Sequence, residues 1–337
     1  MGLKGSLLRW ATSRPHVYLV EAPGAAYVRR AAEAALDARG WRRADSPAQA
    51  DVLLTAGDDA AIAGHLDLVW SQLPGPRVRH QVVDAAAVDA ALDEVARRLR
   101  DAGQHAADAR SREDEVARWL EDDSDAEQMD HGDHGDHGGH DHGGGMAPSG
   151  IPLADGADDR DGLEMDRLVH TLGPALSLWP GGLVVRLTLA GDVVAEVEHR
   201  WLGDVVSPAP ADPAHSAGTH WDAVATTLAL AGDEHAATLA RHLRDRPDDA
   251  THAAARRLRR HVARLHRLRA LPSPVAAALL AEPGAEAGAV DVADLVRGRD
   301  LADARLLIAS HLPRIPRTPG TPGHSAHHAG HEGMSHG

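Results

Sequence analysis

The chain contains no cysteine among its 337 residues. Disulfide bonds and thiolate metal ligands are therefore both excluded, because each requires a cysteine sulfur. Phenylalanine is also absent, and only 2 Tyr and 7 Trp are present, so the hydrophobic cores must be built mainly from Leu, Val and Ala. The missing thiols limit the redox chemistry that the chain could perform by itself.

Long apolar runs are missing as well. No stretch approaches the roughly 18 uninterrupted apolar residues of a membrane-spanning helix. Met1–Trp10 has neither the long apolar core nor the cleavage site of a secretory signal, so we expect a cytoplasmic protein. The formal net charge is -15, from 35 Lys and Arg against 50 Asp and Glu, which disfavours broad attraction to the phosphates of nucleic acid.

The first hundred residues alternate short apolar runs with stretches of helical spacing. The apolar runs His16–Val20, Asp51–Gly57 and Val78–Val83 predict three strands. Each run is followed by a helical pattern, at Tyr27–Ala38, Ala60–Gln72 and Ala85–Asp101. This βαβαβα order predicts a small three-layer α/β domain with a parallel sheet over residues 1–103.

Ligands of parallel sheets bind beyond the carboxyl ends of the strands. Here that edge corresponds to Glu21–Ala26 and Gly57–Ala60, and neither segment contains a G-x-G-x-x-G motif. Asp58 and Asp59 lie in this region and have two interpretations. They bind a cation or polar ligand, or they cap the following helix through its exposed N–H groups, and capping is favoured.

The rest of the chain divides into a linker, a second domain and a tail. Residues 104–160 are acidic and then rich in Gly and His, which predicts a disordered linker. Residues 161–312 are expected to form an α+β domain that opens with a β-hairpin at Leu183–Leu189 and Val193–Val197. Helices are predicted after the hairpin, at Trp221–Ala231, Glu234–Arg244, Thr251–Leu271, Val275–Leu280 and Leu301–His311. Residues 313–337 have the composition of a disordered, His-rich tail. The expected fold class is therefore α/β plus α+β.

Histidines gather in the linker and in the tail. Neutral imidazole suits zinc, nickel and copper, and a flexible Gly-His-Asp string can wrap an ion without a preformed site. The candidate ligands for nickel or zinc are His131, His134, His137, His140, His142, His324, His327, His328, His331 and His336. Storage or delivery of metal is one interpretation, and a solvated spacer with incidental histidines is the other.

The predicted helix Thr251–Leu271 combines an apolar stripe with many arginines. The stripe consists of Leu258, Val262, Leu265 and Leu268. Seven arginines flank it, and the candidates for binding a partner are Arg256, Arg260, Arg264 and Arg267. An acidic partner, an anionic lipid surface, and neutralisation of the chain's own acidic linker are the alternatives. No Ser/His/Asp set or carboxylate pair has a spacing that argues for catalysis.

Two segments of the first domain carry a resemblance to a known family. They are Ser46–Gly57, which reads SPAQADVLLTAG, and Leu68–Pro76, which reads LVWSQLPGP. In order and spacing they resemble the B subunit of bacterial NADH-quinone oxidoreductase, or respiratory complex I. In that family two loops hold the cysteine ligands of a four-iron cluster. The matching loops here lie near Pro23–Ala26 and Asp84–Ala87 and contain no thiol, so the resemblance implies that the iron-sulfur cluster is absent.

The second domain carries a related resemblance. Leu172–Pro174 and Gly181–Val194 resemble the opening of the D subunit of complex I and of related membrane-bound nickel-iron hydrogenases, with the hairpin retained. By this alignment Pro180 stands where the family has its quinone-facing His, and Leu176–Ser177 where it has another His-Pro pair. The resemblance therefore implies that the polar quinone ligands are lost. The D-like part is also much shorter than the family subunit.

The paired resemblance implies a shortened fusion that keeps a docking surface without the family's chemistry. We expect a non-catalytic accessory or assembly subunit of a complex I-like or hydrogenase-like membrane oxidoreductase, with no catalytic and no cofactor-binding residues. Its partners are then subunits of that complex, and its place is at the inner face of the cell membrane. The alternative is a His-rich protein that stores or delivers nickel or zinc.

Deleting residues 129–145 and 324–337 separates these two functions. If the histidine strings handle metal, the deletion removes bound nickel and zinc, which metal analysis of the purified chain measures. If the chain is an accessory subunit, the same deletion leaves partner binding intact, because the two domains are unchanged. Full retention of nickel or zinc by the shortened chain contradicts the assignment of the strings as ligands.

Overall fold

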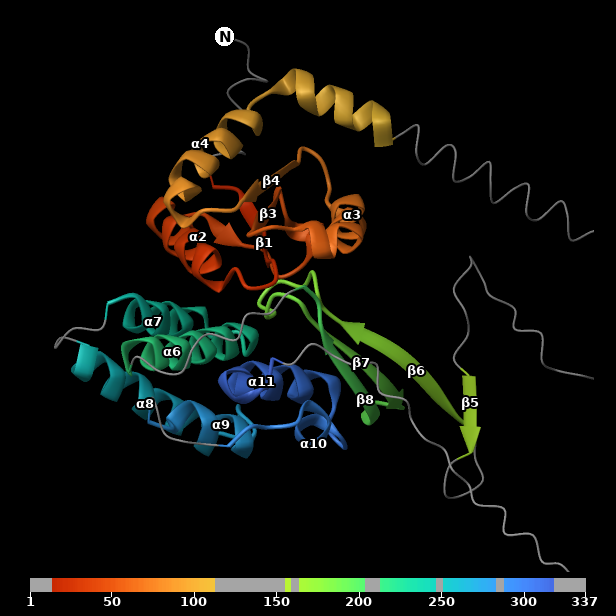
Figure 1. Ribbon diagram of the computed structural model, residues 1–337, viewed down its shortest axis with the longest axis vertical. Helices are drawn as coiled ribbons and strands as arrows, with labels where there is room; N and C mark the ends of the chain where they lie inside the picture. The colour runs from red at the N-terminus through yellow and green to blue at the C-terminus, as the bar shows by residue number, and fades with distance from the viewer. Residues whose placement is uncertain are drawn as a thin grey trace, which may run out of the picture.

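The computed structural model describes residues 14–112, 155–158, 164–203, 213–246, 251–282 and 288–317. Two units follow one another along the chain (Figure 1). The first is built on a parallel sheet, and the second has an antiparallel sheet with helices packed against it. This architecture confirms the predicted fold class, an α/β domain followed by an α+β domain.

The first sheet contains the three predicted strands and one more. Its strands are β1 (His16–Glu21), β2 (Arg42–Arg43), β3 (Val52–Ala56) and β4 (Val78–Val82), in the order β2-β1-β3-β4 with all pairs parallel. β3 is buried throughout and β1 nearly so, because the helices cover the sheet. Burial on both faces explains why these strands read as continuous apolar runs. β2 was not predicted, since two residues give no periodic pattern.

Two helices connect strands of this sheet, and a third follows the last strand. They are α2 (Ala26–Arg39), α3 (Ala63–Gln72) and α4 (Val88–Arg98), and Figure 1 shows α2 and α4 on one side of the sheet with α3 on the other. α2 ends at Gly40, whose φ of 65° lies in the left-handed region that glycine adopts without strain. The helix predicted at Tyr27–Ala38 is therefore confirmed, with one further residue at each end.

A further helix occupies residues 102–112, inside the segment that was predicted to be linker. Arg77 accounts for it, because its buried guanidinium donates to the carboxylate of Asp108 on this helix at 3.0 Å. The same guanidinium lies 4.0 Å from the ring centre of Trp70. The first domain thus continues to at least residue 112 rather than ending at 103. Arg77 and Asp108 are 31 residues apart, and periodicity gives no sign of such a contact.

The second domain opens with an antiparallel sheet in the order β5-β6-β7-β8. Its strands are β5 (Asp155–Asp158), β6 (Glu164–Leu172), β7 (Leu183–Ala190) and β8 (Val193–Trp201). β7 and β8 confirm the predicted hairpin, which turns at Gly191 with a φ of 58°. β6 was not predicted because its central residues are exposed and mix charged with apolar side chains.

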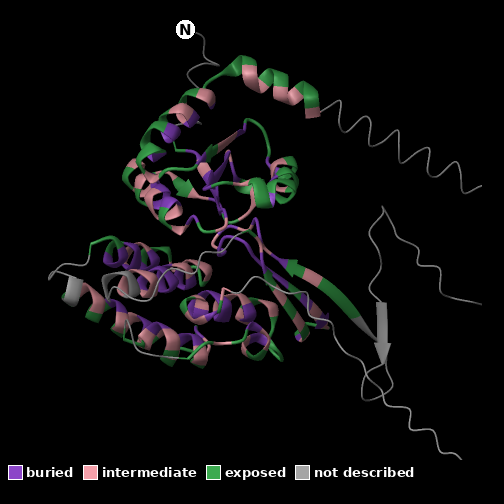
Figure 2. Ribbon diagram, viewed as in Figure 1, coloured by how far each residue is buried: buried purple, intermediate pink, exposed green. Residues whose placement is uncertain are grey.

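Helices follow the hairpin and enclose the second core. They are α6 (Pro213–Leu230), α7 (Glu234–Asp245), α8 (Thr251–Arg267), α9 (Ser273–Leu280), α10 (Val292–Val296) and α11 (Leu301–His311). Figure 2 marks buried residues on the sheet and helices of this domain. The core consists mainly of Leu, Val and Ala, as the composition predicted, with Trp179, Trp201 and Trp221 added. The domain extends past the predicted boundary at 312, because Ile315 is buried and Trp201 Nε1 donates to the carbonyl oxygen of Pro316. Among the helices that the structure describes, none combines the length and apolar composition needed to cross a membrane.

The predicted apolar stripe of α8 is correct for three of its four residues. Leu258 and Val262 are buried and Leu265 is partly buried against the same core, whereas Leu268 is 66% exposed. The helix ends at Arg267, and Arg269 has a φ of 57°. Leu268 lies just beyond this helix end and is not covered by the core, so the predicted apolar stripe extended one residue too far.

Truncating Leu258 and Leu268 in separate variants tests whether the first is buried and the second exposed. Leu258→Ala should lower the free energy of unfolding by about 2–5 kcal/mol, because it removes a fully buried side chain and leaves a cavity. Leu268→Ala is the matched control and should change it by less than about 0.5 kcal/mol, as expected for a surface position. Urea unfolding followed by circular dichroism measures both values. Equal losses in the two variants would contradict the placement of Leu268.

Candidate functional site at the domain interface

The carboxyl edge of the parallel sheet, where a ligand was expected, is covered by the second domain. The backbone of Gly181 lies so close that a Cβ atom placed there would be 2.3 Å from the carbonyl oxygen of Ala22. Gly182 and Gly203 approach Pro23 in the same way. Glycine is required at Gly181 because a side chain there would collide with the first domain, and it is favoured at Gly182 and Gly203 by their positive φ values of 83° and 75°. The segment Glu21–Ala26 therefore faces protein rather than an open cleft.

Tyr18 of β1 fixes the loop that precedes Gly181. Its hydroxyl donates to the carbonyl oxygen of Ala175 at 3.3 Å and accepts from the N–H of Ser177 at 3.0 Å. Burial raises the pKa of Tyr18, and the Ser177 hydrogen bond and Arg305 oppose this only in part. The phenol is therefore neutral and makes both hydrogen bonds. Beside it, Trp179 Nε1 donates to the carbonyl oxygen of Leu183 at 2.7 Å and Gly181 N–H donates to Glu21.

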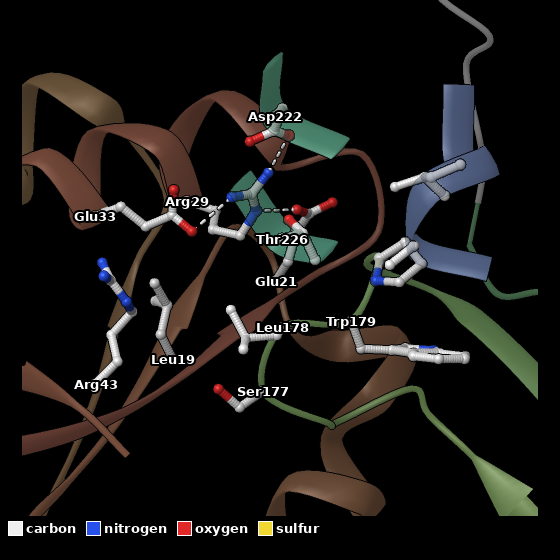
Figure 3. Close-up of a pocket in the computed structure, with 13 residues that line it drawn as sticks. Leu19, Glu21, Arg29, Glu33, Arg43, Ser177, Leu178, Trp179, Asp222 and Thr226 are labelled. Atoms are coloured by element: carbon white, nitrogen blue, oxygen red, sulfur yellow. Dashed lines mark hydrogen bonds and ion pairs between the residues drawn. The ribbon is translucent and has the colours of Figure 1, made fainter. Parts of the chain in front are cut away.

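Buried charges join the two domains next to this loop. Arg29 of α2 lies between three carboxylates, those of Glu21 at the end of β1, Glu33 of α2 and Asp222 of α6 (Figure 3). Arg244 of α7 contacts Glu33 at 2.6 Å and Asp222 at 2.7 Å. Each domain thus contributes both an arginine and a carboxylate, and the pairs Arg29–Asp222 and Arg244–Glu33 cross between the domains.

The ionisation of this cluster follows from its pairing. Burial disfavours charge on Asp222, but Arg29, Arg30 and Arg244 outweigh burial and hold the pKa of Asp222 well below its ordinary value. Burial likewise disfavours charge on Arg29, and the surrounding carboxylates nevertheless raise its pKa well above that of a free arginine. The pKa of Glu33 is lowered for the same reason. All of these groups are charged at neutral pH, so none is poised to exchange a proton there.

A second set of ion pairs extends the interface toward solvent. Arg241 of α7 donates to Asp37 of α2 at 3.1 Å, and Arg43 of β2 pairs with Glu234 at the start of α7. These contacts cross between the domains in both directions. Together with the buried cluster, they fix the orientation of α7 against α2.

A small cavity lies beside the cluster, as Figure 3 shows. It has a volume of about 30 Å³, which is room for one or two water molecules and too little for an organic cofactor. Its walls come from both domains: Leu19, Glu21, Arg29, Glu33, Arg43, Ser177, Leu178, Trp179, Pro180, Asp222, Thr226, Ala309 and Leu312. Leu178 adopts a φ of 56°, which is unfavourable for a leucine and shows how tightly this loop is held.

At the positions compared with family ligands in the sequence, the residues have structural roles. Pro180 lines the cavity, Ser177 contributes its N–H to Tyr18, and Asp84 caps a short helix by accepting from the N–H of Ala86. Within the described ranges, no three His, Asp or Glu side chains are grouped so that they could hold a metal ion. The arrangement can order water and position backbone, and its residue types do not form a nucleophile–base pair.

The other predicted site residues have separate locations. Asp58 accepts from the N–H of Ala60 at 3.2 Å, which supports the capping interpretation, while Asp59 lies 4.0 Å from Arg79. The four candidate arginines of α8 are exposed and are not part of the interface. The ten candidate histidines lie outside the described residues.

Sequence reasoning missed the interface cluster. Arg29 and Glu33 are four residues apart in a predicted helix, which suggests only a surface ion pair. Asp222 and Arg244 gave no signal, because their partners are about 200 residues distant in the chain. Glu21 at the end of a buried strand was the one indication that a charge lies inside.

Removing one carboxylate tests the cluster. Asp222→Asn leaves Arg29 and Arg244 buried with too few negative partners, so we expect the free energy of unfolding to fall by about 3–5 kcal/mol. Asp93→Asn is the matched control, since Asp93 pairs with Arg39 on the surface, and it should cost less than about 1 kcal/mol. Denaturant unfolding of both variants measures the difference. Equal effects contradict a buried interface cluster.

The lowered pKa of Asp222 also predicts that the stability of the protein depends on pH. An acid whose folded pKa is depressed stabilises the protein above its unfolded pKa, and the effect is lost as pH falls toward the folded pKa. Asp222 therefore contributes stability above about pH 4–5 that disappears in more acidic solution. The wild type should lose more stability than Asp222→Asn between about pH 5 and pH 2.

Comparison with known proteins does not add to this geometry. Family models, curated proteins and solved structures were all compared with the chain, and none of them matches it. The function must therefore be argued from the interface itself and from the residues that carry the resemblance to complex I.

Proposed function

We propose that the chain is a non-catalytic accessory or assembly subunit of a complex I-like or hydrogenase-like membrane oxidoreductase. One observation supports this most strongly. The sheet edge that would face a cofactor in the B-like domain is packed against Gly181, Gly182 and Gly203 of the D-like domain. A protein that fills this edge with its own backbone is suited to holding a shape for a partner rather than to electron transfer.

The contact between the two domains is a second line of support. The B-like and D-like parts meet through the loop 173–183, which is the region where the resemblance puts the quinone-facing residues of the D subunit. A fused pair that retains this contact can present a B/D-type surface to neighbouring subunits. The buried ion pairs keep the pair in one orientation, and a rigid surface binds with less loss of conformational entropy.

The residue types at the interface are consistent with a non-catalytic role. Proline and leucine occupy the positions of the family's histidines, and no thiol exists anywhere in the chain. The remaining polar groups are consumed by ion pairs within the interface. We assign the partners as subunits of a membrane oxidoreductase, and the location as the cytoplasm at the inner face of the cell membrane.

Storage or delivery of nickel or zinc by the histidine strings is the second candidate. The observation in its favour is the concentration of histidines at 131–142 and 324–336. It requires nothing of the interface, so the two functions are separable. The string deletion described above distinguishes them, because partner binding depends on the domains and metal binding on the strings.

Affinity purification from the membranes of the native host tests the accessory role. We expect the tagged full-length chain to recover subunits of an oxidoreductase or transporter-like membrane subunits, identified by mass spectrometry. Asp222→Asn, which weakens the domain interface, should reduce their recovery relative to Asp93→Asn, because the bound surface spans both domains. Recovery of no such subunit with wild type contradicts the proposal. Equal recovery with both variants contradicts the role of the interface in presenting that surface.

A further inference from the structure

α8 lies on the side of the second domain away from the first (Figure 1), and Figure 2 marks part of this helix as exposed. Most of its arginines are among the exposed residues. Its buried side is occupied by Leu258 and Val262. The exposed residues are Arg256, Arg257, Arg260, Arg264 and Arg267, and Arg269 follows the helix end. We call these six residues the arginine face. So many like charges on one helix repel one another unless anions lie close by.

Within the described residues, no carboxylate pairs with the arginine face. Arg259, which belongs to the same helix but lies half-buried, pairs with Glu282 and lies 5.9 Å from the ring centre of Trp221. His261 contacts Asp233. Every acidic group that reaches α8 is thus taken by a residue outside the arginine face. The arginine face is therefore a positively charged surface without a paired carboxylate among the described residues.

The chain's own excess of acid lies in one segment. Residues 113–154 contain twelve Asp and Glu and a single basic residue, Arg118. This segment therefore supplies most of the net charge of -15. The densest part is 121–130, which reads EDDSDAEQMD. The arginine face and this acidic segment are the two strongest opposite charges in the chain.

The length of the segment allows contact. Its 42 residues can extend over roughly 140 Å, whereas a body of the size described has a radius of gyration of about 18 Å. Attachment at both ends also raises the local concentration of the segment to about the millimolar range. Weak ion pairs are sufficient under these conditions.

We propose that the acidic segment, centred on residues 121–130, docks on the arginine face of α8 in the same chain. The occupant is a polypeptide whose carboxylates pair with Arg256, Arg260, Arg264 and Arg267. An acidic surface of another protein has to displace this segment in order to bind there. The docking is independent of the accessory role, because it involves neither the domain interface nor the sheet edge.

Distance measurement in the full-length chain tests the proposal. The absence of native cysteine allows two introduced cysteines, Ser124→Cys and Ala270→Cys, to carry spin labels without background. Ala270 is exposed just beyond the end of α8. Double electron–electron resonance should detect a short-distance population at low salt. That population should disappear near 1 M salt, where the screening length is about 3 Å.

Two matched variants distinguish docking on the arginine face from a general effect of positive charge. Changing Arg256, Arg260, Arg264 and Arg267 to Gln should reduce the short-distance population by about tenfold, because four exposed ion pairs are lost together. Changing Arg42, Arg100, Arg297 and Arg299 to Gln removes the same charge from exposed sites elsewhere and should leave the population unchanged. Circular dichroism confirms that both variants are folded.

Three results overturn the proposal. The first is a distance distribution that neither salt nor the arginine variant changes. The second is a short-distance population that disappears on dilution with excess unlabelled chain, since the contact then joins two copies. The third is sedimentation of the wild-type chain with phosphatidylglycerol vesicles in the absence of any short-distance population, because the arginine face then binds lipid.

Discussion

Arg29 donates to carboxylates from both domains, and the arrangement of the second domain on the first depends on this contact. Its guanidinium contacts Glu21 and Glu33 of its own domain and Asp222 of the other. Removing such charges from water is costly, and the cost is offset only when geometry and hydrogen bonding are both satisfied. Arg244 completes the set from the opposite side by contacting Glu33 and Asp222. A displaced second domain would lose the Arg29–Asp222 and Arg244–Glu33 pairs, so the network favours a single orientation.

This orientation determines what the sheet edge can do. Once Asp222 is held against Arg29, the loop 173–183 lies on the end of β1, where Gly181 allows the two backbones to approach closely. The edge is then occupied by protein, and only a water-sized cavity remains beside it. The accessory role that we propose follows from this packing together with the types of residue present. A cofactor would need both donor side chains and space, and the loop supplies proline, leucine and glycine instead.

Much of the fold could be predicted from local patterns. The runs at 16–20 and 51–57 are largely buried strands, the run at 78–83 is a strand with partly exposed middle residues, and the turn at Gly191 joins the predicted hairpin. Errors arose where distant contacts override local pattern. Arg77 holds the helix 102–112 through Asp108, a contact over 31 residues, and the core leaves Leu268 exposed at the end of its predicted stripe. The site was less predictable, because Asp58 could be interpreted as a cap from its position alone, whereas Asp222 and Arg244 are unremarkable until their partners are known.

The sequence by itself determined which metal ligands the chain lacks and the order of its strands and helices. The lack of cysteine removes thiolate ligands, and the apolar periods specify the parallel sheet and the hairpin because strand and helix periods are local properties. Only the tertiary structure decided which charges are buried and what covers the sheet edge. Those features depend on side chains from α2, α6 and α7 that lie about 200 residues apart and meet only after the domains have docked. Burial changes the energy of a charge far more than its sequence neighbours do, and for that reason the interface could not be inferred from the sequence.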